Sequence, residues 1–277
     1  MNRVLMYCNK QNELANKIAE MTTNYLHSIN INFINDNEIN IEEIQNITSE
    51  IDAIITFGGD GTILSAARKY VDTDIPIMGF NVGKLGFLSE FSANYIKENI
   101  DNLLNKNYKI IKRFLLTAKL NAEQYLAIND FVIRNAEQSK LITLSAFANE
   151  QYIGDYRADG LIISTPTGST AYSMACGGPI IYPDANVYCI TPISPHTFTL
   201  RPLIIPTNKT TKIKLTTNSK NNASIIADGN YAGQMLHSEE LEIGIYTKEA
   251  QFIVPLGSNY FDVLRNKLLW AENIVKE

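Results

Sequence analysis

The stretch AIITFGGDGTILSAA, residues 53–67, is the strongest constraint on the fold of this chain. Its first part is a continuous apolar run, as expected of a strand buried on both faces of a parallel sheet. After the glycines, Ile63, Leu64 and Ala67 recur at helical spacing. An Asp-Gly pair also favours a hairpin turn, but a hairpin needs alternating polar and apolar residues on both sides, and these flanks lack them. The stretch therefore predicts a strand, a glycine turn and a helix.

Asp60 stands among the glycines of this turn. Backbone N–H groups beside a helix N-terminus form an anion site, and glycines let a ligand approach the backbone closely. A carboxylate in such a place repels a phosphate, so it makes sense as a group that binds a metal, accepts a proton or receives a sugar hydroxyl. The alternative is that Asp60 only shapes the turn, and the surrounding pattern favours a functional role over that alternative.

Strand and helix patterns alternate over about the first hundred residues, which is typical of a parallel sheet covered by helices. RVLMYC, INFI and IPIMGF read as strands, and a helical face is marked by Leu14, Ile18, Met21 and Tyr25. From about Phe114, short runs rich in β-forming residues follow one another, including LEIGIYT and QFIVPL, separated by Asn, Asp, Gly and Pro. This spacing predicts a mostly antiparallel β domain.

A helical pattern returns in SNYFDVLRNKLLWAENIVKE, and we expect its apolar face to pack back on the N-terminal layer. The fold class predicted is an α/β N-terminal domain with a parallel sheet, followed by a mostly antiparallel β domain. The expected domains are an α/β domain over residues 1–113, joined by the C-terminal helix 258–277, and a β-rich domain over residues 114–257.

Composition excludes several classes of function. The 277 residues carry a formal net charge of -5 and no basic run, which argues against nucleic acid and membrane surfaces as partners. The 3 cysteines form no C-x-x-C pair, so a disulfide framework or a structural zinc site is not expected. No stretch reaches the length of a membrane span. We expect a cytoplasmic protein.

Familiar nucleotide and metal motifs are missing. GFNVGKL resembles a P-loop but has three residues instead of four between its glycines, and Leu85 stands where Ser or Thr binds magnesium. No G-x-G-x-x-G follows a strand, and the 3 histidines are scattered. A dehydrogenase, a zinc hydrolase and a histidine-based triad are therefore disfavoured.

Two further stretches carry unusual polar residues. YRADGLIISTPTGSTAYSMACGGPII, residues 156–181, places small and hydroxyl-bearing residues after a short apolar strand. This lets a polar ligand lie close to the backbone, although a small-residue helix packed on a sheet explains the composition equally well. In AINDFVIR, Asn129 and Asp130 interrupt a strand pattern, for which a bulge is the simpler explanation. For His196 a rigid loop is favoured, and for Asp228 a plain turn.

Together these stretches resemble the NAD kinase family. The resemblance rests on GGDGT at 58–62, NVGKLGFL at 81–88, AIND at 127–130, the block at 156–179, and SPH at 194–196 leading to RPLIIP. It implies transfer of the γ-phosphoryl group of ATP to the 2′-hydroxyl of the adenosine ribose of NAD, which gives NADP. It further implies Mg²⁺ held mainly by the ATP phosphates, no metal ligand from the chain, and a homodimer or homotetramer.

The resemblance also assigns roles to individual residues. It makes Asp60 the general base, with Gly61 beside it at the ribose and Leu64 and Phe87 as walls of the pocket. The turn residues that it expects to hold phosphate are Gly58, Gly59, Gly61 and Thr62. The further residues that it expects to contact NAD are Asn129, Asp130, Arg157, Asp159, Thr167, Thr170, Ala171, Tyr172, Ala175 and Ser194.

Three positions depart from the family pattern. Asp130 stands where the family has Glu, which is one methylene longer, and Ala175 and Cys176 stand where Ser-Ala is frequent. Asn230 follows ADG, where many members have Gln. We expect these changes to affect affinity for NAD more than activity.

Two alternatives stay open at this point. GGDGT is shared with diacylglycerol-type lipid kinases and related to a motif of 6-phosphofructokinases, but such a kinase has no need of the STPTGSTAYS segment. A non-catalytic dinucleotide-binding regulator is disfavoured by the intact Asp60. The pattern does not distinguish ATP from polyphosphate as the donor, NAD from NADH as the acceptor, or an enzyme inhibited by NADPH from one that is not.

Overall fold

The computed structural model describes residues 3–9, 11–83, 86–137, 141–216 and 222–269. The chain divides into two compact units, called unit 1 (Met1–Lys112 with Ala250–Glu277) and unit 2 (Arg113–Glu249). Of the C-terminal segment expected to join the first domain, residues 270–277 lie outside the described residues. The second unit boundary falls inside one long strand, β17 (Glu240–Pro255), which supplies residues to both units.

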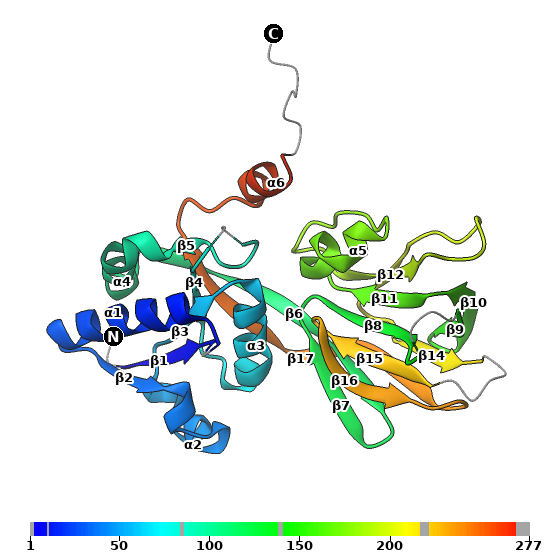
Figure 1. The fold of residues 1–277 in the computed structure, drawn as a ribbon, viewed down its shortest axis with the longest axis horizontal. Coiled ribbons are helices and arrows are strands. Elements are labelled where there is room, and N and C mark those ends of the chain that lie inside the picture. The colour runs from blue at the N-terminus through cyan, green and yellow to red at the C-terminus, as the bar shows by residue number, and fades with distance from the viewer. Residues whose placement is uncertain (1–2, 10, 84–85, 138–140, 217–221, 270–277) are drawn as a thin grey trace, which may run out of the picture. The chain divides into compact units, whose positions relative to one another are not determined.

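Unit 1 is built on a parallel sheet (Figure 1). β1 (Arg3–Cys8) pairs with β2 (Asn32–Asn35) on one side and β3 (Ala53–Gly58) on the other. β3 in turn pairs with β4 (Ile77–Asn81), and β4 pairs with β5 (Phe91–Ser92) and with the C-terminal part of β17. All 6 residues of β3 are buried, as its continuous apolar run predicts. The expected parallel sheet is confirmed.

Helices cover both faces of this sheet. The helices of unit 1 before its last segment are α1 (Glu13–Ser28), α2 (Ile41–Asn46), α3 (Asp60–Tyr70) and α4 (Ile96–Leu104). Ile18 of α1 and Ile100 of α4 share one apolar cluster with Ile55 of β3. α3 packs on the sheet too, where the Ser65 and Tyr7 hydroxyl oxygens lie 2.9 Å apart.

The buried face of α1 differs from the predicted one. Leu14 and Met21 are more than half exposed, and the residues that face the sheet are Ala15, Ile18, Thr22 and Leu26. Thr22 is buried without an unpaired hydroxyl because its Oγ1 donates to the Ile18 carbonyl oxygen at 2.8 Å. A hydroxyl that bonds within its own helix can thus replace an apolar residue on the inner face.

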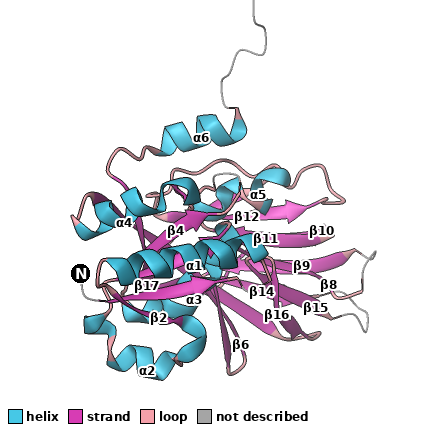
Figure 2. Ribbon diagram, turned by 60° about the vertical axis from the view of Figure 1, so that its left-hand side comes forward, coloured by secondary structure: helices cyan, strands magenta, loops and turns pink. Residues whose placement is uncertain are grey.

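The helix after β17 belongs to unit 1, as the returning helical pattern predicts. This helix, α6 (Tyr260–Leu268), buries Val263 and Leu264. The segment before it is fixed to unit 1 by Lys109, whose Nζ donates to the Ser258 carbonyl oxygen at 2.6 Å. Figure 2 shows α6 above α4 and β4 in that view.

Unit 2 consists of antiparallel strands around one apolar core, which confirms the predicted β class. One sheet has the order β13 (Leu203–Pro206), β12 (Val187–Ile193), β11 (Gly160–Ser164), β8 (Asp130–Asn135), β15 (Ala223–Ala227) and β16 (Asn230–Met235). The strands facing it are β10 (Gln151–Ala158), β9 (Ile142–Ala148), β14 (Thr211–Leu215), the N-terminal part of β17, β6 (Tyr108–Leu120) and β7 (Glu123–Ala127). Phe131, Ile163 and Ile213 all lie in the shared core.

Some strands of unit 2 differ from the sequence expectation. LEIGIYT and QFIVPL, expected as separate runs, form the single strand β17 of 16 residues. VYCITPI forms β12, which ends just before the loop expected around His196. Tyr188 and Ile190 of this strand are fully buried, and every residue of GLIIS pairs with it. Tertiary pairing here outweighs local propensity.

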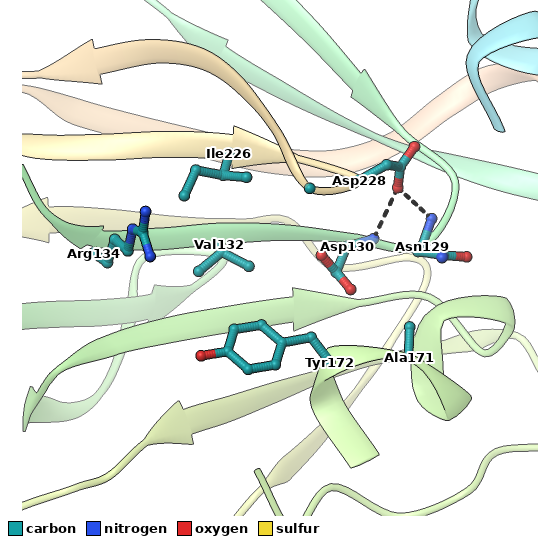
Figure 3. Close-up of a pocket in the computed structure, with 9 residues that line it drawn as sticks. Asn129, Asp130, Val132, Arg134, Ala171, Tyr172, Ile226 and Asp228 are labelled. Atoms are coloured by element: carbon teal, nitrogen blue, oxygen red, sulfur yellow. Dashed lines mark hydrogen bonds between the residues drawn. The ribbon is translucent and has the colours of Figure 1, made fainter. Parts of the chain in front are cut away.

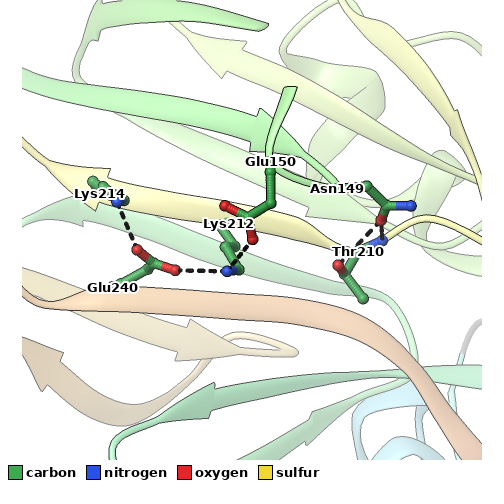
Figure 4. A network of polar contacts seen from close by, with 6 residues as sticks. All are labelled: Asn149, Glu150, Thr210, Lys212, Lys214 and Glu240. Carbon is green, nitrogen blue, oxygen red and sulfur yellow. Dashed lines mark hydrogen bonds and ion pairs between the residues drawn. The ribbon is translucent and has the colours of Figure 1, made fainter. Parts of the chain in front are cut away.

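A polar network marks one solvent-facing part of unit 2 (Figure 4). Glu240 of β17 lies opposite Lys214 of β14, with 2.8 Å between Oε2 and Nζ, and its Oε1 lies 3.3 Å from the Nζ of Lys212. Lys212 also contacts Glu150. Exposed ion pairs stabilise a fold only weakly. Their cross-strand placement supports the register of β14 against β17 and shows no sign of a binding site.

Candidate active site

The glycine turn of unit 1 has the predicted form of strand, turn and helix. Asp60 is the first residue of α3, and Gly59 is its N-cap. A Cβ atom at Gly58 would lie 2.1 Å from the Thr62 Oγ1, so no larger residue fits there without movement. Cβ atoms at Gly59 and Gly61 would have no neighbour within 4 Å. The space over the turn is therefore open, and the first N–H groups of α3 point toward it.

The Asp60 carboxylate is held by the loop that follows β4. Its Oδ1 accepts hydrogen bonds from the Ser89 hydroxyl at 2.9 Å, the Ser89 N–H at 3.1 Å and the Leu88 N–H at 3.3 Å. Its Oδ2 accepts one from the Phe87 N–H at 2.7 Å. A Cβ atom at Gly86 would lie 1.8 Å from Oδ1, so this loop can approach Asp60 only with glycine at that position. GGDGT and NVGKLGFL thus form one structure.

Ser89 connects this carboxylate to the end of β4. The residue is fully buried, and its hydroxyl oxygen accepts hydrogen bonds from the Asn81 Nδ2 at 2.8 Å and the Gly86 N–H at 3.1 Å. Because those two donors occupy the oxygen, the hydroxyl proton is left for Asp60. Of the expected pocket walls, Phe87 is half-buried beside Asp60, and Leu64 is buried on α3.

Unit 2 contains a cavity of about 370 Å³ on the outer side of β8 and β15 (Figure 3). Val132 and Ile226 give it an apolar floor, and Tyr172 lies across from them. Figure 3 shows Arg134 at the left end of the group and Asp130 on the other side of Val132, next to Asn129. The remaining lining residues are Asn129, Ala171, Asp228 and Gly229. A cavity with one aromatic wall, an apolar floor and polar residues around them is suited to part of a nucleotide.

Asp228 fixes the turn that carries Asn129 and Asp130. Its carboxylate accepts hydrogen bonds from the N–H groups of Ile128 at 3.1 Å, Asn129 at 2.7 Å and Asp130 at 3.2 Å. The Asp130 carbonyl oxygen accepts one back from the Asp228 N–H at 3.0 Å. The bulge expected at Asn129 and Asp130 is instead this turn, which lies between the end of β7 and the start of β8.

The block at 156–179 is bound to the same turn. A Cβ atom at Gly168 would lie 2.1 Å from the Asn129 carbonyl oxygen, and the Thr165 N–H donates to that oxygen at 2.9 Å. Thr167 and Thr170 are the ends of a short 3-10 helix, Thr167–Thr170, and Ala175 ends the short helix α5 (Tyr172–Ala175). The expected small-residue helix is therefore only one turn long.

Arg157, Asp159 and Ser194 form a second group, outside the lining of this cavity. All three are exposed. Asp159 is joined to the end of β12 by its N–H, which donates to the Ile193 carbonyl oxygen at 3.0 Å, and the Arg157 carbonyl oxygen accepts from the His196 N–H at 2.9 Å. The SPH segment and the start of the 156–179 block thus lie together.

Three residues around these sites were not singled out from the sequence as site residues. Arg134 lines the cavity, and its place four residues after Asp130 put it on the same face of a strand. Asp228 is expected in a plain turn, and its φ of 46° fits that turn. Its carboxylate also accepts a hydrogen bond from the Asn129 N–H, which the sequence did not indicate. Ser89 follows NVGKLGFL directly and carried no signal of its own.

The described part of the chain does not meet the requirements of a three-ligand metal site or of a membrane-spanning helix. No group of three or more His, Cys, Asp or Glu side chains there is placed to hold a metal ion. Within the same residues, no helix combines the length and apolar character needed to cross a membrane.

Two solved structures have the same fold as this chain. The structure of yeast NADH kinase complexed with NADH matches with a TM-score of 0.90 at 23% identity, covering 100% of this chain and 90% of that one. An NAD kinase from Archaeoglobus fulgidus in complex with ATP matches with a TM-score of 0.77 at 23% identity, covering 97% and 99%. The chain therefore shares its fold with these two kinases.

Sequence relatives identify the family. Residues 4–108 match the ATP-NAD kinase N-terminal domain, and residues 128–254 match the ATP-NAD kinase C-terminal domain. The NAD kinase of Sulfurimonas denitrificans is 37% identical over 230 residues, 82% of this chain and 80% of that enzyme. The NAD kinase of Fusobacterium nucleatum is 32% identical over 276 residues, 99% and 100% of the two chains. The chain belongs to the NAD kinase family, enzymes that phosphorylate NAD with ATP, and the resemblance seen in its sequence is confirmed.

Proposed function

We propose that Asp60 is the general base that receives the proton of the 2′-hydroxyl on the adenosine ribose of NAD. The observation that carries this proposal is that the two carboxylate oxygens of Asp60 accept different numbers of hydrogen bonds. Among the described residues, Oδ1 accepts hydrogen bonds from Leu88 and Ser89, whereas Oδ2 accepts only that of the Phe87 N–H. A carboxylate oxygen has about two lone-pair sites. Oδ2 therefore keeps one for a substrate hydroxyl.

In this mechanism the ribose oxygen bonds to the γ-phosphorus of ATP while the bond to the β-phosphate oxygen breaks and ADP leaves. The hydroxyl proton passes to the Asp60 Oδ2 and then to solvent. The open N–H groups of the turn at Gly59 and Gly61 hold phosphate oxygens, and Gly58 and Thr62 shape the turn. Mg²⁺ enters with ATP and offsets the charge of the triphosphate.

The residues of unit 2 bind the rest of the dinucleotide. Asn129, Asp130, Ala171 and Tyr172 are supported as NAD contacts because they line one cavity. Thr167 and Thr170 follow the Pro166 turn, which is tied to Asn129, and Ala175 ends the next helix. Arg157, Asp159 and Ser194 are exposed polar groups suited to the charged or hydroxyl parts of NAD.

The assembly and location proposed for the enzyme rest on the resemblance. We propose a cytoplasmic homodimer or homotetramer. Its cysteines Cys8, Cys176 and Cys189 are free thiols, which suits a reducing compartment. Unit 2 exposes several large apolar side chains, including Phe198, Ile204 and Tyr231, which suits contact with another copy.

The assay that tests this function supplies purified protein with NAD, ATP and Mg²⁺ and detects NADP with an NADP-specific dehydrogenase. We expect NADP to accumulate with all components and none to form when Mg²⁺ is chelated. Diacylglycerol and a sugar phosphate in place of NAD serve as competing acceptors. Phosphorylation of either in place of NAD would overturn the proposal, and so would NAD binding without turnover.

Ser89→Ala tests whether the loop at 86–89 positions Asp60. The change removes the donor to Oδ1 and the hydroxyl oxygen that accepts from the Asn81 Nδ2, at a cost of about 1–3 kcal/mol. If roughly half of this is lost from the transition state, kcat falls by between about twofold and about tenfold with little change in KM for NAD. Ser92→Ala is the matched control, because among the described residues the Ser92 hydroxyl accepts a hydrogen bond only from the nearby Asn94 N–H. Equal kcat values for the two variants would contradict the positioning role.

A further inference from the structure

Asp130 is a buried carboxyl group that receives no hydrogen bond on its side chain from the residues that the structure describes. It is 4% exposed and borders the cavity of unit 2. No side chain or backbone N–H of the described residues donates to its carboxylate oxygens, although its own backbone N–H is bonded to Asp228. A buried carboxylate without donors or a paired cation is costly, and such a group normally takes up a proton.

Asp228 is the charged member of this carboxyl pair. It accepts the N–H groups of Ile128, Asn129 and Asp130, and such donors stabilise the ionised form of a carboxylate. Its negative charge acts on Asp130 from the turn between β15 and β16. A negative charge beside a buried carboxyl group disfavours the ionised form of that group.

The other titratable groups around Asp130 do not favour its ionised form. Arg134 is four residues further along β8, roughly 13 Å away at the rise of a strand, which is too far for an ion pair. From α5 and the residue after it come Tyr172 and Cys176, and burial raises the pKa of both. The strand β11 contributes Ser164, which does not titrate. Burial, with the charge of Asp228 second, raises the pKa of Asp130 to about 7.

We propose that NAD binds to the enzyme form in which Asp130 is a neutral carboxylic acid, and that this acid donates a hydrogen bond to an acceptor atom on a base of the bound NAD. This deepens the proposed function and rests on it for the ligand. Both bases of NAD carry such acceptors: the adenine ring its nitrogens, and the nicotinamide ring its carboxamide oxygen. The flat space between Tyr172 and the floor of Val132 and Ile226 suits a planar ring. The neutral acid also spares the anionic dinucleotide a second negative charge beside Asp228.

A neutral Asp130 that donates a hydrogen bond gives NAD binding the opposite pH dependence to an ionised Asp130 that accepts one. An ionised Asp130 accepts hydrogen bonds and binds more tightly as the pH rises, whereas a neutral Asp130 donates one and loses it on ionisation. The shorter side chain at this position, Asp where the family has Glu, keeps the group closer to its own backbone and to Asp228. The sign of the pH dependence therefore distinguishes donor from acceptor.

The test is calorimetric titration of the full-length enzyme with NAD, without ATP, between about pH 6 and about pH 8.5. For a group that must be protonated, with a pKa of about 7, the Kd for NAD rises roughly 30-fold across this range. Asp130→Asn keeps a donor that does not titrate, so we expect its Kd to match the wild-type value at low pH and stay constant. Asp130→Leu removes the donor, and weak binding at every pH is expected.

Asp155→Asn is the matched control, since this exposed carboxylate of β10 is outside the lining of the cavity. We expect the Asp155→Asn variant to show the same pH dependence of the Kd for NAD as the wild type. ADP-ribose, which lacks nicotinamide, identifies the base: a retained pH dependence places the acceptor on adenine, and a lost one places it on the carboxamide. A wild-type Kd that is constant or falls with rising pH would overturn the proposal, as would an Asp130→Asn variant that keeps the rise. NAD binding without NADP formation would sink the proposed function alone.

Discussion

Asp60→Asn lowers kcat by between about 10² and about 10⁴ while the Kd for NAD changes little, if Asp60 is the general base. The amide is nearly the same size as the carboxylate but does not take up the hydroxyl proton. Its carbonyl oxygen in the Oδ1 position keeps the contacts with Leu88 and Ser89. Its NH₂ group then faces the Phe87 N–H, so a single loop contact is lost. Steady-state kinetics and calorimetry with NAD measure the two quantities separately.

The control for this experiment is Ser89→Ala, which disturbs the same loop and keeps the carboxylate. A structural role for Asp60 predicts similar losses in the two variants, with matching changes in NAD affinity. The proposed chemical role predicts that the loss of kcat in Asp60→Asn is at least tenfold greater than in Ser89→Ala. An Asp60→Asn enzyme that keeps more than about half of the wild-type kcat would contradict the assignment.

Asp130→Asn raises the stability of unit 2 at alkaline pH, with an effect of up to about 4 kcal/mol. The pKa of Asp130 is raised from 3.8 to about 7 by burial and by the charge of Asp228. Between these values the folded protein holds a proton that the unfolded chain has released, so the free energy of unfolding falls as the pH rises through this window. Each pKa unit corresponds to about 1.4 kcal/mol. The asparagine variant does not titrate and escapes this loss.

Denaturant unfolding followed by circular dichroism, at about pH 4.5 and about pH 8, measures this difference. The two proteins should have similar stability at the lower pH, and the variant should gain on the wild type as the pH increases, with no further change well above the pKa. Asp155→Asn again serves as the control and should parallel the wild type. A stability difference between Asp130→Asn and wild type that is the same at both values would show that Asp130 is ionised throughout.

The local part of the site in unit 1 could be predicted from the sequence because its signals lie close together in the chain. A buried strand, glycines that admit no larger residue at Gly58, and a helical repeat after Asp60 all fall within residues 53–67. The partners of Asp60 are different. They come from a loop 27 to 29 residues further on, and only the tertiary fold brings Ser89 to the carboxylate.

The contacts around the cavity of unit 2 also join residues far apart in the sequence, so they could not be predicted from local patterns. Asp228 lies 98 residues from Asp130, and their contact follows from the pairing of β15 with β8, which no local pattern of the chain contains. An Asp-Gly pair at a strand end predicts a turn, and the turn is present. Its second role becomes visible only when the carboxylate is seen to accept the N–H groups of the Asn129 turn. β17 differs from the prediction for the related reason that strand pairing sets its limits.

The central claim is that Asp60 directs phosphate to one hydroxyl, the 2′-position of the adenosine ribose. Phosphorus NMR of the product formed from NAD, ATP and Mg²⁺ tests it most directly, because each ribose hydroxyl gives a distinct phosphomonoester signal. The account predicts one new signal, that of 2′-phosphorylated NAD, with wild-type enzyme, and its absence with Asp60→Asn over the same time. A phosphate on another hydroxyl, or the same signal at the same rate with Asp60→Asn, would contradict it.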